Sequence, residues 1–372
     1  MISIKEVKDK KGMKQFVMFP FSLYKNNTYW VPPIINDELA NFNANSNPIF
    51  EHANANFFLA YKNNEIVGRI IAIVNTYEVK KQNIKKMRFG WFDFIDDHEV
   101  SKALLDKVKA IGKSNNLNFV EGPVGFNNLD KTGVLVDGFD HIGTMITWYN
   151  HPYYKDHLEK LGFKKEKEYI ESKFPFKNVN LEKYTKAGNL IQKRYGLKEI
   201  NFKSTKDIIP YVDEMFDLFS QTYSKLSTYV PISQKQIEYF KKKYISFINP
   251  EYIKFVMDKD ENMVAFAIVM PSFSKSLQKN KGKLFPFGLL RLLNARKKSK
   301  DVIFYLIGVH PDYQNKGVTA VIFREFAKTF RNKGIENCIR TPELEDNIAI
   351  HKIWKDFSPT IHKRRRTYRI DL

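Results

Sequence analysis

The stretch of the chain with the clearest chemical potential runs from residue 306 to residue 319. A β-branched strand pattern ends there in a polar loop that contains Gly317, and a helical pattern begins directly after the loop. Backbone N–H groups at such a strand-to-helix loop converge, and with the positive end of the helix dipole they bind anions. Gly317 permits close approach of the backbone, and Lys316 adds a positive charge. The spacing is therefore compatible with a pyrophosphate site, although a glycine between a strand and a helix, taken alone, more often belongs to a plain connecting loop.

The whole string narrows this interpretation. The run Val309-His310-Pro311-Asp312-Tyr313-Gln314-Asn315-Lys316-Gly317 resembles the acyl-CoA signature of the GNAT N-acetyltransferase superfamily. In that signature Gln or Arg, two variable residues, Gly, one more residue and Gly or Ala surround the CoA pyrophosphate. Thr319 takes the last place, where this chain departs from the family's small residue. The resemblance implies acetyl-CoA or another acyl-CoA as co-substrate, and no metal.

The resemblance also implies which residues contact the co-substrate. The strand would pair its main chain with pantetheine, and the loop would hold the pyrophosphate. Asn347, at the start of the last predicted helix, would contact CoA or act as that helix's N-cap. The implied cofactor-binding residues are Ile307, Gly308, Val309, Gln314, Asn315, Lys316, Gly317, Val318, Thr319 and Asn347.

Acid–base groups are less clearly marked. Acyl transfer to an amine needs a base for the ammonium and an acid for the leaving thiolate. Many GNAT members use a carboxylate on the strand before the loop and a tyrosine in the last helix. Here strand 302–309 contains no carboxylate, and Trp354 stands near the tyrosine's place. The remaining catalytic candidates, each with a structural role as the alternative, are Tyr305, Glu343, Glu345 and His351.

The elements that must position this loop occur twice along the chain. The first set is a hairpin at 57–74, a strand at 89–94, a helix at 101–115, a strand at 119–123 and a helix at 151–162. The second set is a helix at 208–225, a hairpin at 252–270, a strand at 302–309, a helix at 319–333, a strand at 336–341 and a helix at 347–357. This repeated order of elements favours internal duplication.

The repeat predicts an α/β (α+β) chain of two tandem GNAT-like domains, each with a mixed, mainly antiparallel central sheet flanked by helices. We expect a degenerate N-terminal domain at 1–175, a junction at 176–200 and a C-terminal domain with the acyl-CoA site at 201–372. The first repeat is degenerate because the acidic run Ile95–Glu99 replaces the glycine loop and would repel a pyrophosphate. Runs such as Tyr29–Pro33 resemble a group of bacterial tandem GNAT-like proteins.

Composition bounds the partners and the compartment. The 372 residues carry a formal net charge of +20, but the lysines are spread along the chain, which argues against nucleic acid as the partner. No apolar run is long enough for a membrane span, and residues 1–14 are charged where a signal peptide is apolar, so a cytoplasmic location is expected. The single cysteine, Cys338, is predicted to be a small buried residue.

Two basic segments leave alternatives open. Residues 281–298 set a dense apolar block beside basic residues, which suits contact with an anionic membrane or the lining of a pocket for a long acyl chain. The simpler and favoured interpretation is an amphipathic helix packed between the two domains with its lysines in water. Lys363–Arg366 could hold a phosphate or form a solvated terminal strand.

The sequence thus favours a CoA-dependent N-acyltransferase that acts on a small-molecule or peptide amine. Two alternatives remain: a non-catalytic acyl-CoA-binding protein, which the missing strand carboxylate favours, and a basic adaptor for RNA or anionic lipid, which the net charge favours.

Overall fold

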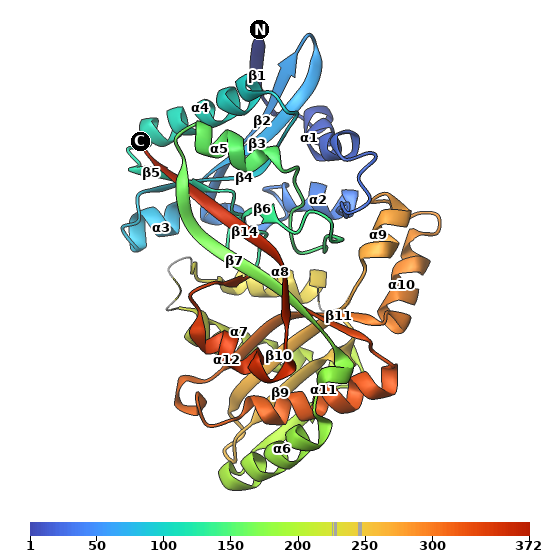
Figure 1. The fold of residues 1–372 in the computed structure, drawn as a ribbon. Helices are drawn as coiled ribbons and strands as arrows, with labels where there is room; N and C mark the ends of the chain where they lie inside the picture. The colour runs from blue at the N-terminus through green and yellow to red at the C-terminus, as the bar shows by residue number, and fades with distance from the viewer. Residues whose placement is uncertain (225, 227–228, 245–247) are drawn as a thin grey trace. The chain divides into compact units, whose positions relative to one another are not determined.

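The computed structural model describes residues 1–224, 226, 229–244 and 248–372, which form two compact units (Figure 1). Unit 1 comprises residues 1–170, 274–289 and 362–372, and unit 2 comprises residues 171–273 and 290–361. Each unit contains a mainly antiparallel sheet with helices packed on it.

The sheet of unit 1 runs in the order β1-β2-β3-β4-β5-β14, and the β4–β5 pair is parallel. Its strands are β1 (Ile2–Glu6), β2 (Ala53–Lys62), β3 (Glu65–Asn75), β4 (Lys86–Phe94), β5 (Phe119–Gly122), β6 (Val134–Asp137), which pairs with β14, the first part of β7 (Lys164–Pro175), and most of β14 (Thr360–Asp371). Its helices are α1 (Lys10–Leu23), α2 (Ile35–Asn41), η1 (Pro48–Glu51), α3 (Thr76–Lys81), α4 (His98–Ser114), α5 (Tyr153–Lys160) and α9 (Ser274–Asn280).

Helices cover both faces of this sheet, and the sequence of β3 shows why. The run Ile70–Ile73 is almost continuously apolar and buried, as a strand covered on both faces requires. Leu104 and Val108 of α4 pack on one face, while Phe16 of α1 packs on the other, and each is fully buried. The predicted hairpin and the predicted helix at 101–115 are both present.

The sheet of unit 2 runs in the order β7-β12-β11-β10-β9-β8, and the β11–β12 pair is parallel. Its strands are the end of β7, β8 (Lys198–Asn201), β9 (Ile253–Met257), β10 (Met263–Pro271), β11 (Asp301–Val309), β12 (Asn337–Arg340) and β13 (Glu343–Leu344). Its helices are η2 (Phe176–Asn178), α6 (Leu181–Tyr195), η3 (Thr205–Asp207), η4 (Ile209–Tyr211), α7 (Val212–Tyr223), α8 (Gln234–Tyr244), η5 (Pro250–Tyr252), most of α10 (Gly288–Lys298), η6 (Pro311–Tyr313), α11 (Thr319–Lys333), α12 (Ile348–Trp354) and η7 (Lys355–Phe357).

The core of unit 2 forms where α11 covers β11. Phe323, Phe326 and Phe330 recur at helical spacing, and their side chains are buried with Phe304 of β11 and Trp354 of α12. As predicted, α11 spans 319–333 and ends at Gly334, whose left-handed φ of 62° closes the helix.

The last strand of each repeat completes the sheet of the other unit. β14 follows the second repeat in sequence but pairs with β5 in unit 1, where Tyr368 lies opposite Gly122. β7 follows the first repeat, and its end pairs with β12 in unit 2, where Phe174 lies opposite Cys338. Each exchange covers a strand edge that would otherwise be unpaired, and neither sheet is encoded by one continuous segment.

Residues 176–200, expected as a junction, are part of unit 2. They form η2, α6 and most of β8. Tyr184 is buried among the aromatic side chains of the core, and a Cβ on Gly188 would lie 3.1 Å from the carbonyl oxygen of Ala320. This close approach of α6 to α11 gives the segment its packing role.

The basic run at 363–366 is held within unit 1. The Lys363 amine donates to the carbonyl of Ile142 at 2.7 Å, and Arg365 donates to the carbonyl of Trp148. Both side chains are almost fully buried. Arg364 and Arg366 pair with the carboxylate of Glu168 on β7. The expected terminal strand is present as part of β14, but it is not solvated, because Lys363 and Arg365 are buried and Arg364 and Arg366 are paired with Glu168.

The Glu168 ion pairs should make stability depend on pH. Burial opposes ionisation, but hydrogen bonds from Lys165 and Arg366 lower the pKa of Glu168 from 4.5 to about 2. A lowered folded-state pKa stabilises the fold above about pH 4.5, and this contribution is lost as pH falls toward about 2. Glu168→Gln should therefore cost about 1 to 3 kcal/mol at neutral pH and almost nothing near pH 2, as measured by urea unfolding.

Arg366→Gln should give a similar pH profile, since it removes the partner of the same carboxylate. A deficit for Glu168→Gln that stays constant from pH 7 to pH 2 would contradict this account.

Candidate functional site

The candidate site begins where β11 separates from β12. The two strands pair in parallel from Asp301 opposite Asn337 to Phe304 opposite Arg340. The last contact is a hydrogen bond of 3.3 Å from the Thr341 N–H to the Phe304 carbonyl. Beyond it, no strand in the described part of the chain pairs with residues 305–309 on that side. β11 therefore has a free edge there.

The direction of the main-chain groups on this edge follows from strand alternation. The His310 N–H donates to the Val264 carbonyl at 2.8 Å, toward β10. Because neighbouring residues along a strand present their N–H and C=O groups to opposite sides, Gly308 also faces β10. Ile307 and Val309 therefore face the free edge. Of the three strand residues expected to pair with pantetheine, these two are oriented to do so.

Two side chains contact the carbonyls of the free edge. The Tyr223 hydroxyl, at the end of α7, donates to the Ile307 carbonyl at 3.1 Å. Burial raises the pKa of Tyr223 to about 12. The Gln314 amide donates to the Val309 carbonyl at 3.2 Å. Sequence reasoning missed Tyr223 because no local pattern in α7 indicates which strand its hydroxyl reaches.

A β-bulge interrupts β11 at the start of the free edge. On β10, Ile268 lies opposite Leu306 and Val269 lies opposite Phe304, which leaves Tyr305 as the extra residue. A bulge redirects the backbone and side chain of the extra residue. The catalytic candidate Tyr305 therefore stands at the point where β11 turns from β12 toward its free edge.

The loop after β11 leads directly to the N-terminus of α11. Asn315 and Gly317 have left-handed φ values of 61° and 77°, which bend the loop around the helix end. No side chain caps α11, and within the described ranges no acceptor contacts the N–H groups of Gly317, Val318 and Thr319. Three N–H groups at an uncapped helix start can hold an anion.

The side chains around this loop add positive charge. Lys316 is exposed, and its amine lies 5.5 Å from the Tyr195 ring centroid and 5.1 Å from that of Tyr313. A Cβ on Gly317 would lie 3.2 Å from the Ile191 side chain, in addition to the strained φ. Glycine is therefore the residue that the loop requires at this position.

The corresponding helix start in unit 1 is closed. Asp97 is the N-cap of α4, and its carboxylate accepts from the Glu99 N–H at 2.9 Å and from the Lys62 amine at 2.7 Å. A carboxylate already occupies the position where an anion would bind. The two repeats therefore share a strand–loop–helix shape but differ at the anion cradle.

Glu343 is held in a polar cluster after β12. Its carboxylate pairs with Arg340 and accepts from the Trp354 indole N–H at 3.1 Å, and His351 lies 3.5 Å away. The Arg340 side chain is 4% exposed. These contacts hold the Glu343 carboxylate in place, and its catalytic role stays a prediction. Arg340 was not singled out from the sequence, although a charge inside an apolar strand was the available signal.

Two further expected residues lie beyond β12. Glu345 is exposed. The Asn347 side-chain oxygen accepts from the Ile350 N–H at 3.2 Å, so Asn347 is the N-cap of α12. Its contact with CoA stays a prediction.

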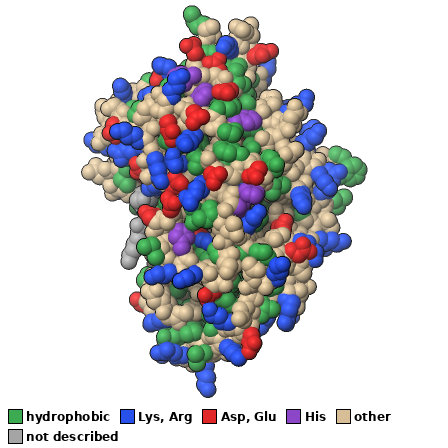
Figure 2. Space-filling view, viewed as in Figure 1, with side chains coloured by type: hydrophobic (Ala, Val, Ile, Leu, Met, Phe, Trp, Pro, Cys, Tyr) green, Lys and Arg blue, Asp and Glu red, His purple; other side chains and the backbone are tan. Residues whose placement is uncertain are grey.

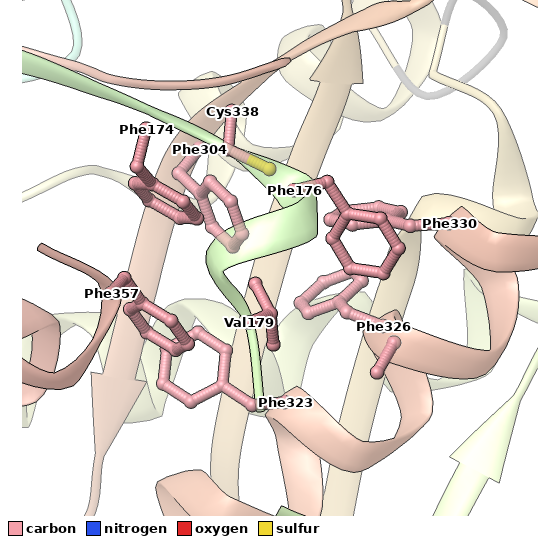
Figure 3. Close-up of a pocket in the computed structure, with 10 residues that line it drawn as sticks. Phe174, Phe176, Val179, Phe304, Phe323, Phe326, Phe330, Cys338 and Phe357 are labelled. Atoms are coloured by element: carbon pink, nitrogen blue, oxygen red, sulfur yellow. The ribbon is translucent and has the colours of Figure 1, made fainter. Parts of the chain in front are cut away.

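A small cavity lies inside unit 2 under η2 (Figure 3). Phe174 and Phe176 line it from β7 and η2, Phe304 from β11, and Cys338 from β12. It has room for about one water molecule, but its apolar walls offer that water no partners. Burial raises the pKa of the Cys338 thiol, so Cys338 is an inert core residue, as predicted. This cavity is too small to hold a co-substrate.

Within the described residues, none of the helices combines the length and the apolar composition that a membrane span requires. The same residues contain no cluster of three or more His, Cys, Asp or Glu side chains suited to a metal ion.

Comparison with solved structures decides the fold. A tandem GNAT protein from the clavulanic acid biosynthesis pathway matches 100% of this chain and 98% of its own length with a TM-score of 0.59, at 8% identity. The chain has the tandem GNAT fold. A probable N-acyltransferase from Enterococcus faecalis V583 also matches, with a TM-score of 0.52 and 6% identity over 99% of this chain and 72% of that one. The predicted fold class and resemblance are confirmed.

Sequence comparison adds two relatives. Protein YghO of Escherichia coli K12 is 25% identical over 367 residues, which cover 97% of this chain and 93% of that protein. The bacterial ceramide synthase of Caulobacter vibrioides is 22% identical over 379 residues, which cover 99% and 97% of the two chains. No protein-family model matches the chain.

The polar cluster yields a stability prediction. Glu343→Leu should destabilise the protein by about 3 to 5 kcal/mol, because it leaves the buried Arg340 charge without its partner. The matched control is Glu345→Gln, which changes an exposed carboxylate two residues away and should cost less than about 0.5 kcal/mol. Thermal or urea unfolding measures both. Equal effects of the two variants would show that Glu343 does not anchor Arg340.

Proposed function

We propose that this protein is a CoA-dependent N-acyltransferase that moves an acyl group from acyl-CoA to an amine. The observation that carries the proposal is the uncapped start of α11 directly after the free edge of β11. A fold by itself does not define an activity. The proposal therefore rests on this site, and the likeness to tandem GNAT structures supports it.

The geometry suggests how acyl-CoA would bind. The N–H groups of Gly317, Val318 and Thr319 would hold the pyrophosphate, and Lys316 would add charge attraction. The main-chain groups of Ile307 and Val309 would pair with the amide groups of pantetheine. The Tyr223 hydroxyl now donates to the Ile307 carbonyl, and it would be released when a pantetheine N–H takes that acceptor.

The reaction is direct attack of the amine nitrogen on the thioester carbon. The C–N bond forms, the C–S bond breaks, the CoA thiolate leaves and gains a proton, and the ammonium loses one. An N–H group at the free edge of β11 would stabilise the oxyanion. Tyr305 at the bulge and Tyr223 are the side chains that we propose to position the reacting groups. Glu343 is less suited to act as base because Arg340 and Trp354 occupy its oxygens.

The relatives suggest the class of substrate. A ceramide is the amide of a long-chain amine and a fatty acid, and the ceramide synthase of Caulobacter vibrioides is similar to this chain over nearly its full length. We therefore propose long-chain amines as acceptors and extend the acyl donor from acetyl-CoA to long-chain acyl-CoA.

Binding of acyl-CoA without turnover is the second candidate function. The occupied carboxylate of Glu343 favours it, since β11 itself offers no carboxylate between Val302 and Val309. Stabilisation by CoA without release of thiol from any donor and amine pair would support this candidate.

The cradle can be tested by calorimetric binding of acetyl-CoA and palmitoyl-CoA. Gly317→Asp should weaken binding at least about tenfold, because it places a carboxylate among the N–H groups that hold the pyrophosphate. Gly334→Asp is the matched control. It also changes a glycine with left-handed φ on α11, but at the opposite end of the helix, and should leave affinity unchanged.

Equal affinity of the wild type and Gly317→Asp would remove the cradle from the proposal. Absence of CoA binding in the wild type would overturn the acyltransferase proposal as a whole.

Turnover can be followed by the release of CoA thiol with a colorimetric reagent. The single cysteine of the chain is buried, so the folded protein should add little background. We expect release with a long-chain amino alcohol and long-chain acyl-CoA to exceed release with short polar amines by at least about tenfold. A preference for short polar amines and acetyl-CoA would reject the lipid substrate class while preserving the acyltransferase.

A further inference from the structure

The segment Pro271–Lys300 has a one-sided charge. It contains nine Lys and Arg residues and no Asp or Glu. In the structure it forms α9, a loop at 281–287, and α10. A stretch of 30 residues with this composition attracts anionic surfaces. It also disfavours packing against a second copy of itself, since the like charges would repel.

Large apolar side chains are exposed in the middle of this segment. Phe285 is 76% exposed and Phe287 61%, and Leu290 and Leu293 of α10 are 63% and 42% exposed. Figure 2 shows hydrophobic side chains beside Lys and Arg side chains at the right of the view, where Figure 1 draws the loop between α9 and α10. Exposed aromatic and leucine side chains so close together in sequence mark an interaction surface.

The loop that carries the phenylalanines is held firmly at its base. The Asn280 amide donates to the Gly288 carbonyl at 2.9 Å across the loop, and the Ile35 N–H donates to the Gly282 carbonyl at 2.9 Å. Gly282 has a φ of 72°, and a Cβ there would lie 2.6 Å from the Pro33 carbonyl oxygen. The exposed tip therefore extends from a fixed base.

We propose that Phe285, Phe287 and Leu289, with the exposed Lys281 and Lys283, form a docking surface for an anionic phospholipid membrane. Aromatic and leucine side chains would enter the boundary between headgroups and acyl chains, and the basic side chains would contact the phosphates. Both parts contribute, because burial of the apolar side chains and attraction between the basic side chains and anionic headgroups add together in binding to a membrane surface. The proposal does not depend on the acyltransferase activity.

The test is flotation of the full chain with vesicles of phosphatidylglycerol and phosphatidylcholine in equal amounts, in 0.1 M salt. The wild type should float with these vesicles and much less with pure phosphatidylcholine. Phe285→Ser combined with Phe287→Ser should lower the partition coefficient at least about tenfold. Lys281→Gln combined with Lys283→Gln should lower it about fivefold for each lysine at low ionic strength.

Matched controls exist on other surfaces. Leu190→Ser changes a leucine of α6 that is 66% exposed, and Lys10→Gln with Lys11→Gln changes two exposed lysines of α1. Neither control should alter the partition. Because the tip side chains are exposed, their replacement should leave the melting temperature unchanged, and this confirms that each variant is folded.

Depth of insertion gives an independent measurement. Phe287→Trp should move its fluorescence to shorter wavelength on anionic vesicles and be quenched by brominated acyl chains. The proposal is overturned if the wild-type protein remains in the unbound fraction and does not float with anionic vesicles. It is also overturned if the Phe285→Ser, Phe287→Ser variant partitions onto vesicles as strongly as Leu190→Ser does. A third contradicting outcome is RNA that competes fully with vesicles and binds equally well to the protein with and without the two phenylalanines.

Discussion

The arrangement of the candidate site depends on the end of one parallel strand pair. β11 and β12 are joined only as far as Phe304 and Arg340, and beyond that point β11 keeps β10 as its neighbour and loses the other. Backbone groups without a partner strand must find other partners. Here Tyr223 and Gln314 contact the carbonyls of Ile307 and Val309. The bulge, the free edge of β11 and the uncapped start of α11 follow one another along the chain, directly after the point where β11 separates from β12.

The strands β7 and β14, each the last of its repeat, hold β12 and β5 in place. β12 has a neighbour on its other side because the end of β7, encoded in the first repeat, pairs with it. In unit 1, β5 is covered in the same way by β14, which buries Tyr368 completely. Each sheet is therefore complete only when both repeats have folded. The N-terminus of α4 has the same strand–loop–helix arrangement as that of α11 but offers no anion site, because the Asp97 carboxylate occupies it.

Local patterns in the sequence predicted most elements of both repeats. The limits of α11, its closure at Gly334 and the hairpins of each repeat follow from periodicity and turn residues, which act over a few positions. The role of 176–200 did not follow, because the packing of Tyr184 and Gly188 depends on α11, more than a hundred residues later. The basic run at 363–366 was open to two readings since its partner, Glu168, is equally remote.

The sequence by itself determined the repeated order of elements, the glycine loop at 314–317 and the resemblance to GNAT proteins, because residue types and short spacings carry this information. Only the tertiary structure decided which main-chain groups of β11 are free, that Tyr223 reaches them, and that Arg340 and Trp354 occupy Glu343. It also decided which strand completes each sheet. The physical reason is that strand pairing and buried ion pairs join residues far apart in the chain, so their partners are fixed by packing rather than by local sequence.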